Sequence, residues 1–114
     1  MSTRATSTLA ALAKLARAGR EMRPHATKAA ELFKTLSNEQ RLMILYTLVS
    51  GPLSAVQLNQ RVPLSQSALS QHLGILCDSG IVATTRESQN IIYSLAPGIA
   101  TRMICLLHEE FCSH

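Results

Sequence analysis

The stretch LSQSALSQHLGIL, residues 64–76, decides the fold of this 114-residue chain. Leu69, Leu73 and Leu76 recur within it at helical spacing, which predicts a helix with one buried face. Most of the other positions carry serine, glutamine or histidine, and none carries lysine or arginine. A helix face that only has to meet water usually carries charged side chains. A neutral face made of hydrogen-bonding side chains therefore indicates a specific partner.

A second, shorter helix is expected just before this one. Ser54 is a suitable N-cap for a helix that runs to about Arg61, and Pro63 blocks its continuation. Ser65 then caps the helix quoted above. A short helix, a three-residue turn and a second helix form a helix-turn-helix.

A β-hairpin is expected next in the chain. Gly80 ends the preceding helix, and two β-rich runs follow it, IVATTR at residues 81–86 and NIIYSL at residues 90–95. Residues 87–89 join the two runs. Because this hairpin has the place of a wing, we predict a mostly α-helical winged helix-turn-helix fold with a β-hairpin wing.

Helices are also expected at both ends of the chain. The first begins at Ser7 or Thr8 and ends near residues 19–24, which begin with glycine and end with proline. Residues 25–36 and about 99–112 form two others, because apolar side chains recur in both at helical spacing.

A further helix is expected between residues 25–36 and the helix-turn-helix. Ser37 and Gln40 have the spacing of a capping box, and residues 51–52, glycine and proline, stop the helix. Its predicted inward-facing residues are Leu42, Leu45, Leu48 and Val49.

The charge of the chain is concentrated at its N-terminal end. Residues 1–23 hold five basic side chains and one acidic side chain, whereas residues 24–114 hold six of each. A basic helical arm on a neutral domain is typical of contact with a polyanion, although a solubilising tail has the same composition. The arm also resembles a mitochondrial transit peptide, and an ordinary amphipathic helix explains it as well.

The neutral face of the quoted helix suits the reading of DNA base edges. Its polar positions lie opposite the three leucines when the helix is drawn with about 100° per residue. Glutamine can form two hydrogen bonds with adenine in the major groove, and serine can bond donors or acceptors. A charged face would add affinity without discrimination. The alternative is a solvated face that merely lacks charge.

Three further positions extend this candidate DNA interface. At the helix N-terminus, free backbone N–H groups near Ser65 and Gln66 can meet a phosphate. His72 lies at the edge of the apolar face, either as a hydrogen-bonded structural histidine or as a base contact. Arg86, near the hairpin tip, is either a groove or phosphate contact or an ordinary exposed arginine. The candidate DNA-binding residues are therefore Ser65, Gln66, Ser67, Ser70, Gln71, His72 and Arg86.

The rest of the sequence narrows the class of protein. No apolar stretch is long enough to span a bilayer. No Ser-His-Asp set, glycine-rich phosphate loop or paired-carboxylate motif is found, so we expect no enzyme, and nothing predicts a cofactor. Cys77, Cys105 and Cys112 have no disulfide-framework spacing and follow no secretory signal, which favours reduced thiols in a cytoplasm.

Three stretches of the chain resemble the ArsR family of bacterial winged-helix repressors: LSNEQRLMILYTLV (36–49), LSQSALSQHLGILCDSGIV (64–82) and IIYSL (91–95). The resemblance covers about residues 28–112. It implies a homodimer built from the first and last helices, which represses a promoter with an inverted repeat until an effector releases it. The last helix agrees with a dimer interface, because its apolar side chains cover a wide arc: Ile99, Met103, Ile104, Leu106, Leu107 and Phe111.

The resemblance also bears on sensing. Many family members bind metal through paired cysteines near the helix before the reading helix, where Ser54 and Val56 stand here. The likeness is greatest to the HlyU/BigR-like subgroup, which responds to oxidants or reactive sulfur. Its members pair a cysteine in the RLxIL helix with one near the end of the last helix. Cys112 matches the second position, whereas Tyr46 occupies the first.

Three side chains that suit sensing share one stripe of the last helix: Cys105, His108 and Cys112. Thiolates and imidazole bind Zn²⁺ and soft metals. In a helix Cys105 and Cys112 are about 10 Å apart, too far for a mutual disulfide. Oxidation therefore needs another partner, such as Cys77 or a second subunit. Inert packing is the third interpretation of these cysteines.

We therefore expect a cytoplasmic, homodimeric, sequence-specific regulator of transcription, a repressor released by an effector such as thiol oxidation or reactive sulfur. Its expected partner is double-stranded DNA with an inverted repeat, and no membrane partner is expected. The alternatives are a metal-responsive repressor and a protein-interaction module that has lost DNA binding.

Overall fold

The computed structural model describes the backbone of residues 2–112 and the side chains of residues 8–112. The chain divides between residues 31 and 32 into two compact units. In the first unit, α1 (Ser2–Met22) is followed by a 3₁₀ turn (Arg23–His25). The helix begins before the expected Ser7 or Thr8, because residues 2–7 contain no glycine or proline that would stop it. Helix α2 (Ala26–Leu36) begins in the first unit and ends in the second.

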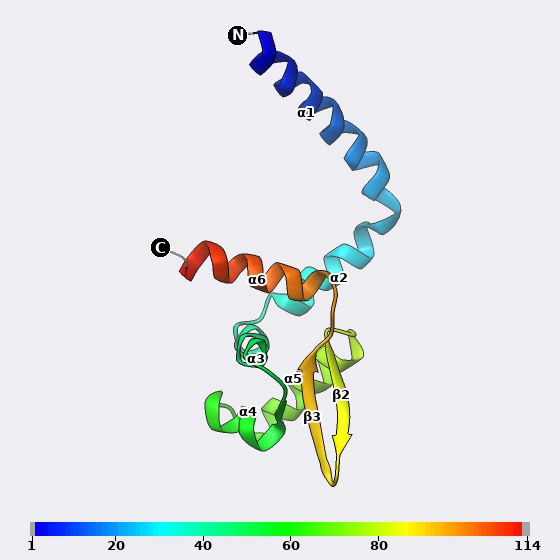
Figure 1. Ribbon diagram of the computed structural model, residues 1–114. Helices are drawn as coiled ribbons and strands as arrows, with labels where there is room; N and C mark the ends of the chain where they lie inside the picture. The colour runs from blue at the N-terminus through cyan, green and yellow to red at the C-terminus, as the bar shows by residue number, and fades with distance from the viewer. Residues whose placement is uncertain (1, 113–114) are drawn as a thin grey trace. The chain divides into compact units, whose positions relative to one another are not determined.

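The second unit is the predicted winged helix-turn-helix (Figure 1). Strands β2 and β3 form an antiparallel hairpin that projects away from α6 in Figure 1. Its elements after α2 follow in the order α3 (Glu39–Val49), β1 (Leu53–Ser54), α4 (Ala55–Arg61), α5 (Gln66–Asp78), β2 (Val82–Glu87), β3 (Asn90–Leu95) and α6 (Ile99–Cys112).

The sheet has one strand more than the sequence predicted. Its order is β1-β3-β2, and Leu53 of β1 lies opposite Tyr93 of β3. Strand β1 has only two residues, which is too short for an alternation pattern, so no sequence pattern predicted it. The hairpin turn is also shorter than expected, because Glu87 pairs with Asn90 and only residues 88–89 connect the strands. Ser88 adopts a left-handed conformation there, with φ of 59°.

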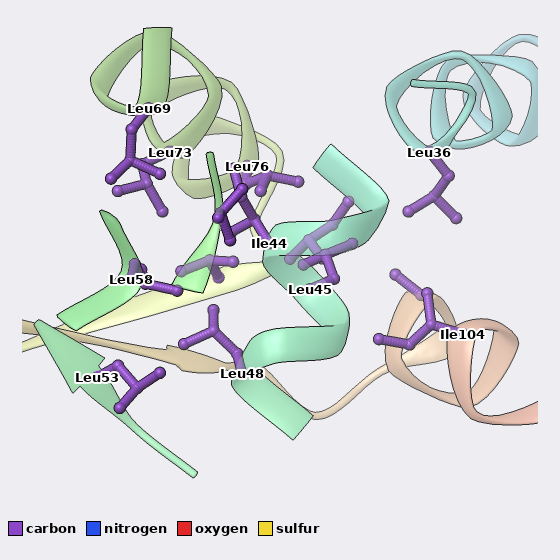
Figure 2. Packing of buried hydrophobic residues seen from close by; sticks show 14 residues of the cluster. Leu36, Ile44, Leu45, Leu48, Leu53, Leu58, Leu69, Leu73, Leu76 and Ile104 are labelled. Carbon is purple, nitrogen blue, oxygen red and sulfur yellow. The ribbon is translucent and has the colours of Figure 1, made fainter. Parts of the chain in front are cut away.

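The core of the second unit lies where α3, α4, α5 and α6 meet the sheet (Figure 2). Ile44 and Leu45 of α3 are fully buried at its centre, and Leu36 of α2 and Ile104 of α6 pack at one end. The three leucines of α5 are also buried, as their spacing predicted. Val49, by contrast, is 51% exposed, so the prediction that it faces inward is wrong: it occupies the last turn of α3, beyond the core.

Helix caps account for most of the element boundaries. Ser54 forms a complete capping box with Gln57, and Ser65 accepts a hydrogen bond from the Ala68 N–H, so both predicted caps are confirmed. The predicted Ser37 cap is wrong. Asn38 caps α3 instead, because its side chain accepts a hydrogen bond from the Arg41 N–H.

Candidate nucleic-acid interface

The first turn of α5 is held by a serine pair. Ser65 Oγ accepts from the Ala68 N–H at 3.1 Å and lies 3.4 Å from Ser67 Oγ. Both serines and Gln66 are exposed. The cap uses one of the free N–H groups of this helix end, and the others remain oriented outward, where a helix dipole attracts anions. The helix N-terminus therefore suits a phosphate contact.

The outer face of α5 is exposed and free of charge except at its end. Ser67, Ser70 and Gln71 are exposed, opposite the buried leucines of the same helix. Asp78, the last residue of the helix, is its only ionisable residue apart from His72 and Cys77. Because the leucines fix which side faces the core, this polar face is presented to solvent as a unit.

Gly74 lies on the same face as Gln71. A Cβ built at Gly74 would meet nothing within 4 Å, so the packing of the protein does not require glycine there. Glycine weakens a helix relative to alanine. Its presence at an unobstructed position on this face fits a partner that approaches the backbone closely.

His72 is half-buried and hydrogen-bonded on both ring nitrogens. Its Nε2 lies 3.2 Å from Oε1 of Gln40, and its Nδ1 lies 3.5 Å from Nη1 of Arg41. These contacts favour the structural interpretation of His72 over a base contact. The sequence did not identify Gln40 and Arg41 as its partners, since they lie more than thirty residues away and carry no local signal of the contact.

The wing presents one basic side chain near its tip. Arg86 is exposed in β2, opposite Ile91 of β3. It lies in the strand rather than in the turn itself, because the turn contains only residues 88–89. An exposed cation at this end of a projecting hairpin is placed to meet phosphate.

A separate apolar surface lies between α2, α3 and α6. It forms an open hollow of about 300 Å³ that is lined, apart from Ser37, by apolar side chains. Phe33 is 62% exposed and Leu106 is 64% exposed at its rim. Contiguous exposed apolar patches usually mark an interface. We call this surface the apolar face and define it by its lining residues: Phe33, Leu36, Ser37, Leu42, Met103, Leu106 and Leu107.

Two of the thiols lie on α6, and the third, Cys77, lies in the last turn of α5. All three cysteines are free; Cys105 and Cys112 are exposed, and Cys77 is half-buried. Burial, together with the nearby Asp78 carboxylate, raises the pKa of Cys77. A raised pKa lowers the thiolate fraction and thus the reactivity of a thiol.

Tyr46 joins α3 to the thiol-bearing side of α6. Its hydroxyl donates to the Ile104 carbonyl at 3.0 Å, and its ring lies 6.3 Å from that of His108. Burial raises the pKa of Tyr46, and the charges of Cys112 and Cys105 raise it further. Tyr46 also lines one hollow of the surface together with Cys105 and His108.

Within one copy of the described chain, the α6 stripe does not form a metal site by itself. Within residues 2–112, no three His, Cys, Asp or Glu side chains lie close enough to hold a metal ion together. Cys105, His108 and Cys112 thus form no three-ligand site, because they extend along the helix rather than converging on a point.

None of the described helices is both long and apolar enough to cross a membrane.

Comparison with known proteins places this geometry in a family. The profile described as "Bacterial regulatory protein, arsR family" matches residues 38–84. The transcriptional activator HlyU of Vibrio cholerae is 45% identical over 92 residues, which cover 81% of this chain and 85% of the relative. The biofilm growth-associated repressor of Xylella fastidiosa is 41% identical over 93 residues, covering 82% of each protein.

Solved structures agree with these sequence matches. Reduced HlyU from Vibrio cholerae has a TM-score of 0.76 at 44% identity, covering 82% of this chain and 99% of that one. The transcriptional repressor BigR from Xylella fastidiosa has a TM-score of 0.74 at 40% identity, covering 83% and 97%. The winged helix of those regulators is therefore the fold of this chain. The chain belongs to the ArsR family of bacterial regulatory proteins, and it is a DNA-binding regulator of transcription rather than an enzyme.

Proposed function

We propose that this protein is a homodimeric repressor that reads an inverted-repeat operator through α5. The observation that carries the proposal is the exposed, almost uncharged face of α5 opposite three buried leucines. Such a face gains little from phosphate attraction, so its affinity for DNA depends on matching hydrogen bonds with base edges.

The roles of the candidate residues follow from their places. Gln71 pairs with a base in the major groove, with Ser67 and Ser70 beside it on the same face. Ser65 and Gln66 lie against a phosphate at the helix N-terminus, and Arg86 reaches the phosphates or minor groove beside the wing. His72 supports the helix from its flank, and it has no free ring nitrogen for a base.

The apolar face supports the homodimer. Met103, Leu106 and Leu107 of α6 lie on one flank of the inward-facing Ile104, whereas Cys105 and His108 lie on the other. A second copy that covers Leu106 and Phe33 removes from water side chains that a single domain leaves exposed. A two-fold dimer then presents two α5 helices to half-sites about one DNA turn apart, roughly 34 Å.

The basic arm, residues 1–23, adds nonspecific attraction to DNA. Lys14, Arg17 and Arg20 of α1 are exposed. Cations of this kind release counterions from DNA and strengthen binding to every sequence alike.

We further propose that oxidation or reactive sulfur controls the repressor through Cys112 and Cys105. Both thiols are exposed, whereas Cys77 is partly shielded and its pKa is raised. Tyr46 occupies the position of a thiol partner on α3, so a disulfide of an α6 thiol requires Cys77 or a thiol of another chain. Such chemistry needs thiols that stay reduced at rest, which fits a bacterial cytoplasm.

Selection from a random-sequence duplex library tests the proposal. The full-length protein is expected to recover an inverted repeat with half-site centres about 10 base pairs apart, or a multiple of that spacing. Recovery of no common sequence would overturn it, and a lack of any salt-dependent DNA affinity would favour a protein-interaction module. Leu106→Glu is expected to yield a monomer in sedimentation, whereas His108→Glu, on the opposite flank of α6, leaves the dimer intact.

A further inference from the structure

Arg41 links the end of α2 to the middle of α5. Its Nε donates to the Thr35 carbonyl at 2.7 Å, and its Nη2 donates to the Lys34 carbonyl at 3.4 Å. Its remaining nitrogen, Nη1, reaches Nδ1 of His72 at 3.5 Å. One half-buried guanidinium thus contacts two elements outside its own helix. Because the guanidinium is planar and rigid, it donates to all three acceptors at the same time.

The contacts select one tautomer of the His72 ring. A guanidinium only donates hydrogen bonds, so His72 Nδ1 must accept from Arg41. The proton of the neutral ring then lies on Nε2, which donates to the Gln40 side chain. Two consecutive side chains of α3 therefore hold one imidazole of α5 from both ring nitrogens.

This arrangement adds directional contacts to the leucine packing that orients α5 about its own axis. The leucines that bury the helix make apolar contacts, which are not directional. His72, by contrast, is held through directional hydrogen bonds, and it directly follows Gln71 in the chain. A helix with its side chains is roughly 10–12 Å across, so a rotation of about 10° moves a side-chain tip by about 1 Å. That displacement is enough to disturb a paired contact with a base edge.

The other end of the link lies at the apolar face. Thr35 and Lys34 belong to the last turn of α2. Leu36 and Phe33, in the same turn, line the apolar face together with α6. The Arg41 guanidinium therefore contacts the backbone that carries the dimer surface and the helix that carries the base-reading surface.

We infer that Arg41 is a positioning residue that couples the apolar face to α5, so that the orientation of the reading helix depends on the geometry of the dimer. The inference rests on the proposed function, because it makes Arg41 a determinant of how specifically the proposed DNA interface binds. Loss of the fork lowers affinity for the matched sequence and spares the charge-driven affinity that is common to all DNA.

Arg41→Lys separates positioning from charge. Lysine keeps the positive charge but cannot reach three acceptors in one plane. Fluorescence anisotropy at one fixed salt concentration compares the duplex recovered by selection with a scrambled duplex of the same composition. We expect Arg41→Lys to weaken binding to the selected duplex about tenfold and to change binding to the scrambled duplex less than about twofold. Arg61→Lys is the matched control: Arg61 is an exposed α4 arginine for which no side-chain hydrogen bond is found in the described structure.

A double-mutant cycle tests the path through His72. His72→Ala is also expected to weaken binding to the selected duplex about tenfold. Because both changes remove the Arg41–His72 contact, the two losses are expected not to multiply in the double variant. If His72→Ala fails to fold, Gln40→Ala takes its place, because Gln40 is exposed and holds the other ring nitrogen.

Three results would overturn the inference while the proposed function stands. They are an unchanged affinity of Arg41→Lys for the selected duplex, an equal loss on both duplexes, and losses that multiply in the double variant. A wild-type protein that fails to distinguish the two duplexes would overturn the proposed function itself, and this inference with it.

Discussion

The Tyr46 hydroxyl donates a 3.0 Å hydrogen bond to the Ile104 carbonyl, which ties the centre of α3 to the centre of α6. Ile104 is fully buried, so this bond lies beside the core rather than at the surface. Its position is the one where the resemblance to the HlyU/BigR-like subgroup implied a thiol. A hydrogen-bonded phenol thus stands at the position that, by the resemblance, carries a cysteine in the subgroup.

Removal of this hydroxyl is expected to cost stability but not DNA affinity. Tyr46→Phe loses one hydrogen bond, which is worth about 1 kcal/mol of unfolding free energy. The Ile104 carbonyl lies inside α6 and keeps its helical partner, so no larger loss is expected. Urea denaturation measures the change. Tyr93→Phe is the control, because no hydrogen bond is found for its hydroxyl in the described structure; equal losses in the two variants would contradict the role assigned to Tyr46.

The three thiols are expected to react at different rates. Burial and Asp78 raise the pKa of Cys77, so below that pKa a smaller share of its thiol is the reactive thiolate. Cys105 and Cys112 are exposed on α6. A time course with iodoacetamide near pH 8, followed by peptide mass spectrometry, should label Cys77 last. The lag of Cys77 should shrink as the pH rises toward its raised pKa. Labelling of Cys77 as early as the other two would contradict the assignment of sensing to α6.

Gln71 is expected to contribute specificity. Gln71→Ala removes a side chain that can form two hydrogen bonds with one base, which predicts a loss of about 1–3 kcal/mol on the selected duplex. Affinity for the scrambled duplex should change little, because no phosphate contact is lost. Gln60→Ala, at an exposed glutamine of α4, is the comparison. An unchanged ratio between the two duplexes would remove Gln71 from the reading face.

Gly74→Ala is expected to separate stability from function. Its Cβ meets nothing in the free protein, and alanine is favoured over glycine in a helix by about 1 kcal/mol. The variant should therefore unfold at a higher temperature and yet bind the selected duplex more weakly, because the proposed function places the added methyl group against the DNA. Gly19→Ala in α1, where a Cβ is equally unobstructed, should stabilise its helix without affecting specificity. Unchanged DNA affinity of Gly74→Ala would show that no partner approaches this backbone.

Local patterns were sufficient to predict the elements around α5. The leucine spacing, the caps Ser54 and Ser65, and the glycine after the helix each depend on residues a few positions apart. The choice between Ser37 and Asn38 as a cap was wrong, because both residue types accept from an N–H three positions on. Only the backbone path decides which oxygen is placed to do so.

Contacts between distant elements were beyond the reach of these patterns. The clamp of His72 by Gln40 and Arg41 joins residues whose sequence neighbourhoods carry no sign of one another. Strand β1 exists because β3 offers it a pairing edge, not because Leu53–Ser54 has a strand pattern. Both features depend on the packed structure.

The most direct test of base reading by α5 is the affinity ratio of the wild-type protein for two duplexes at one salt concentration. One duplex comes from the DNA upstream of its own gene, and the other is a scrambled duplex of the same length and composition. In fluorescence anisotropy, the reduced, full-length protein is predicted to bind the upstream duplex at least about a thousandfold more tightly than the scrambled duplex. Equal affinities for the two duplexes, both falling steeply with salt, would mean that charge alone binds DNA and that the neutral face of α5 reads no bases.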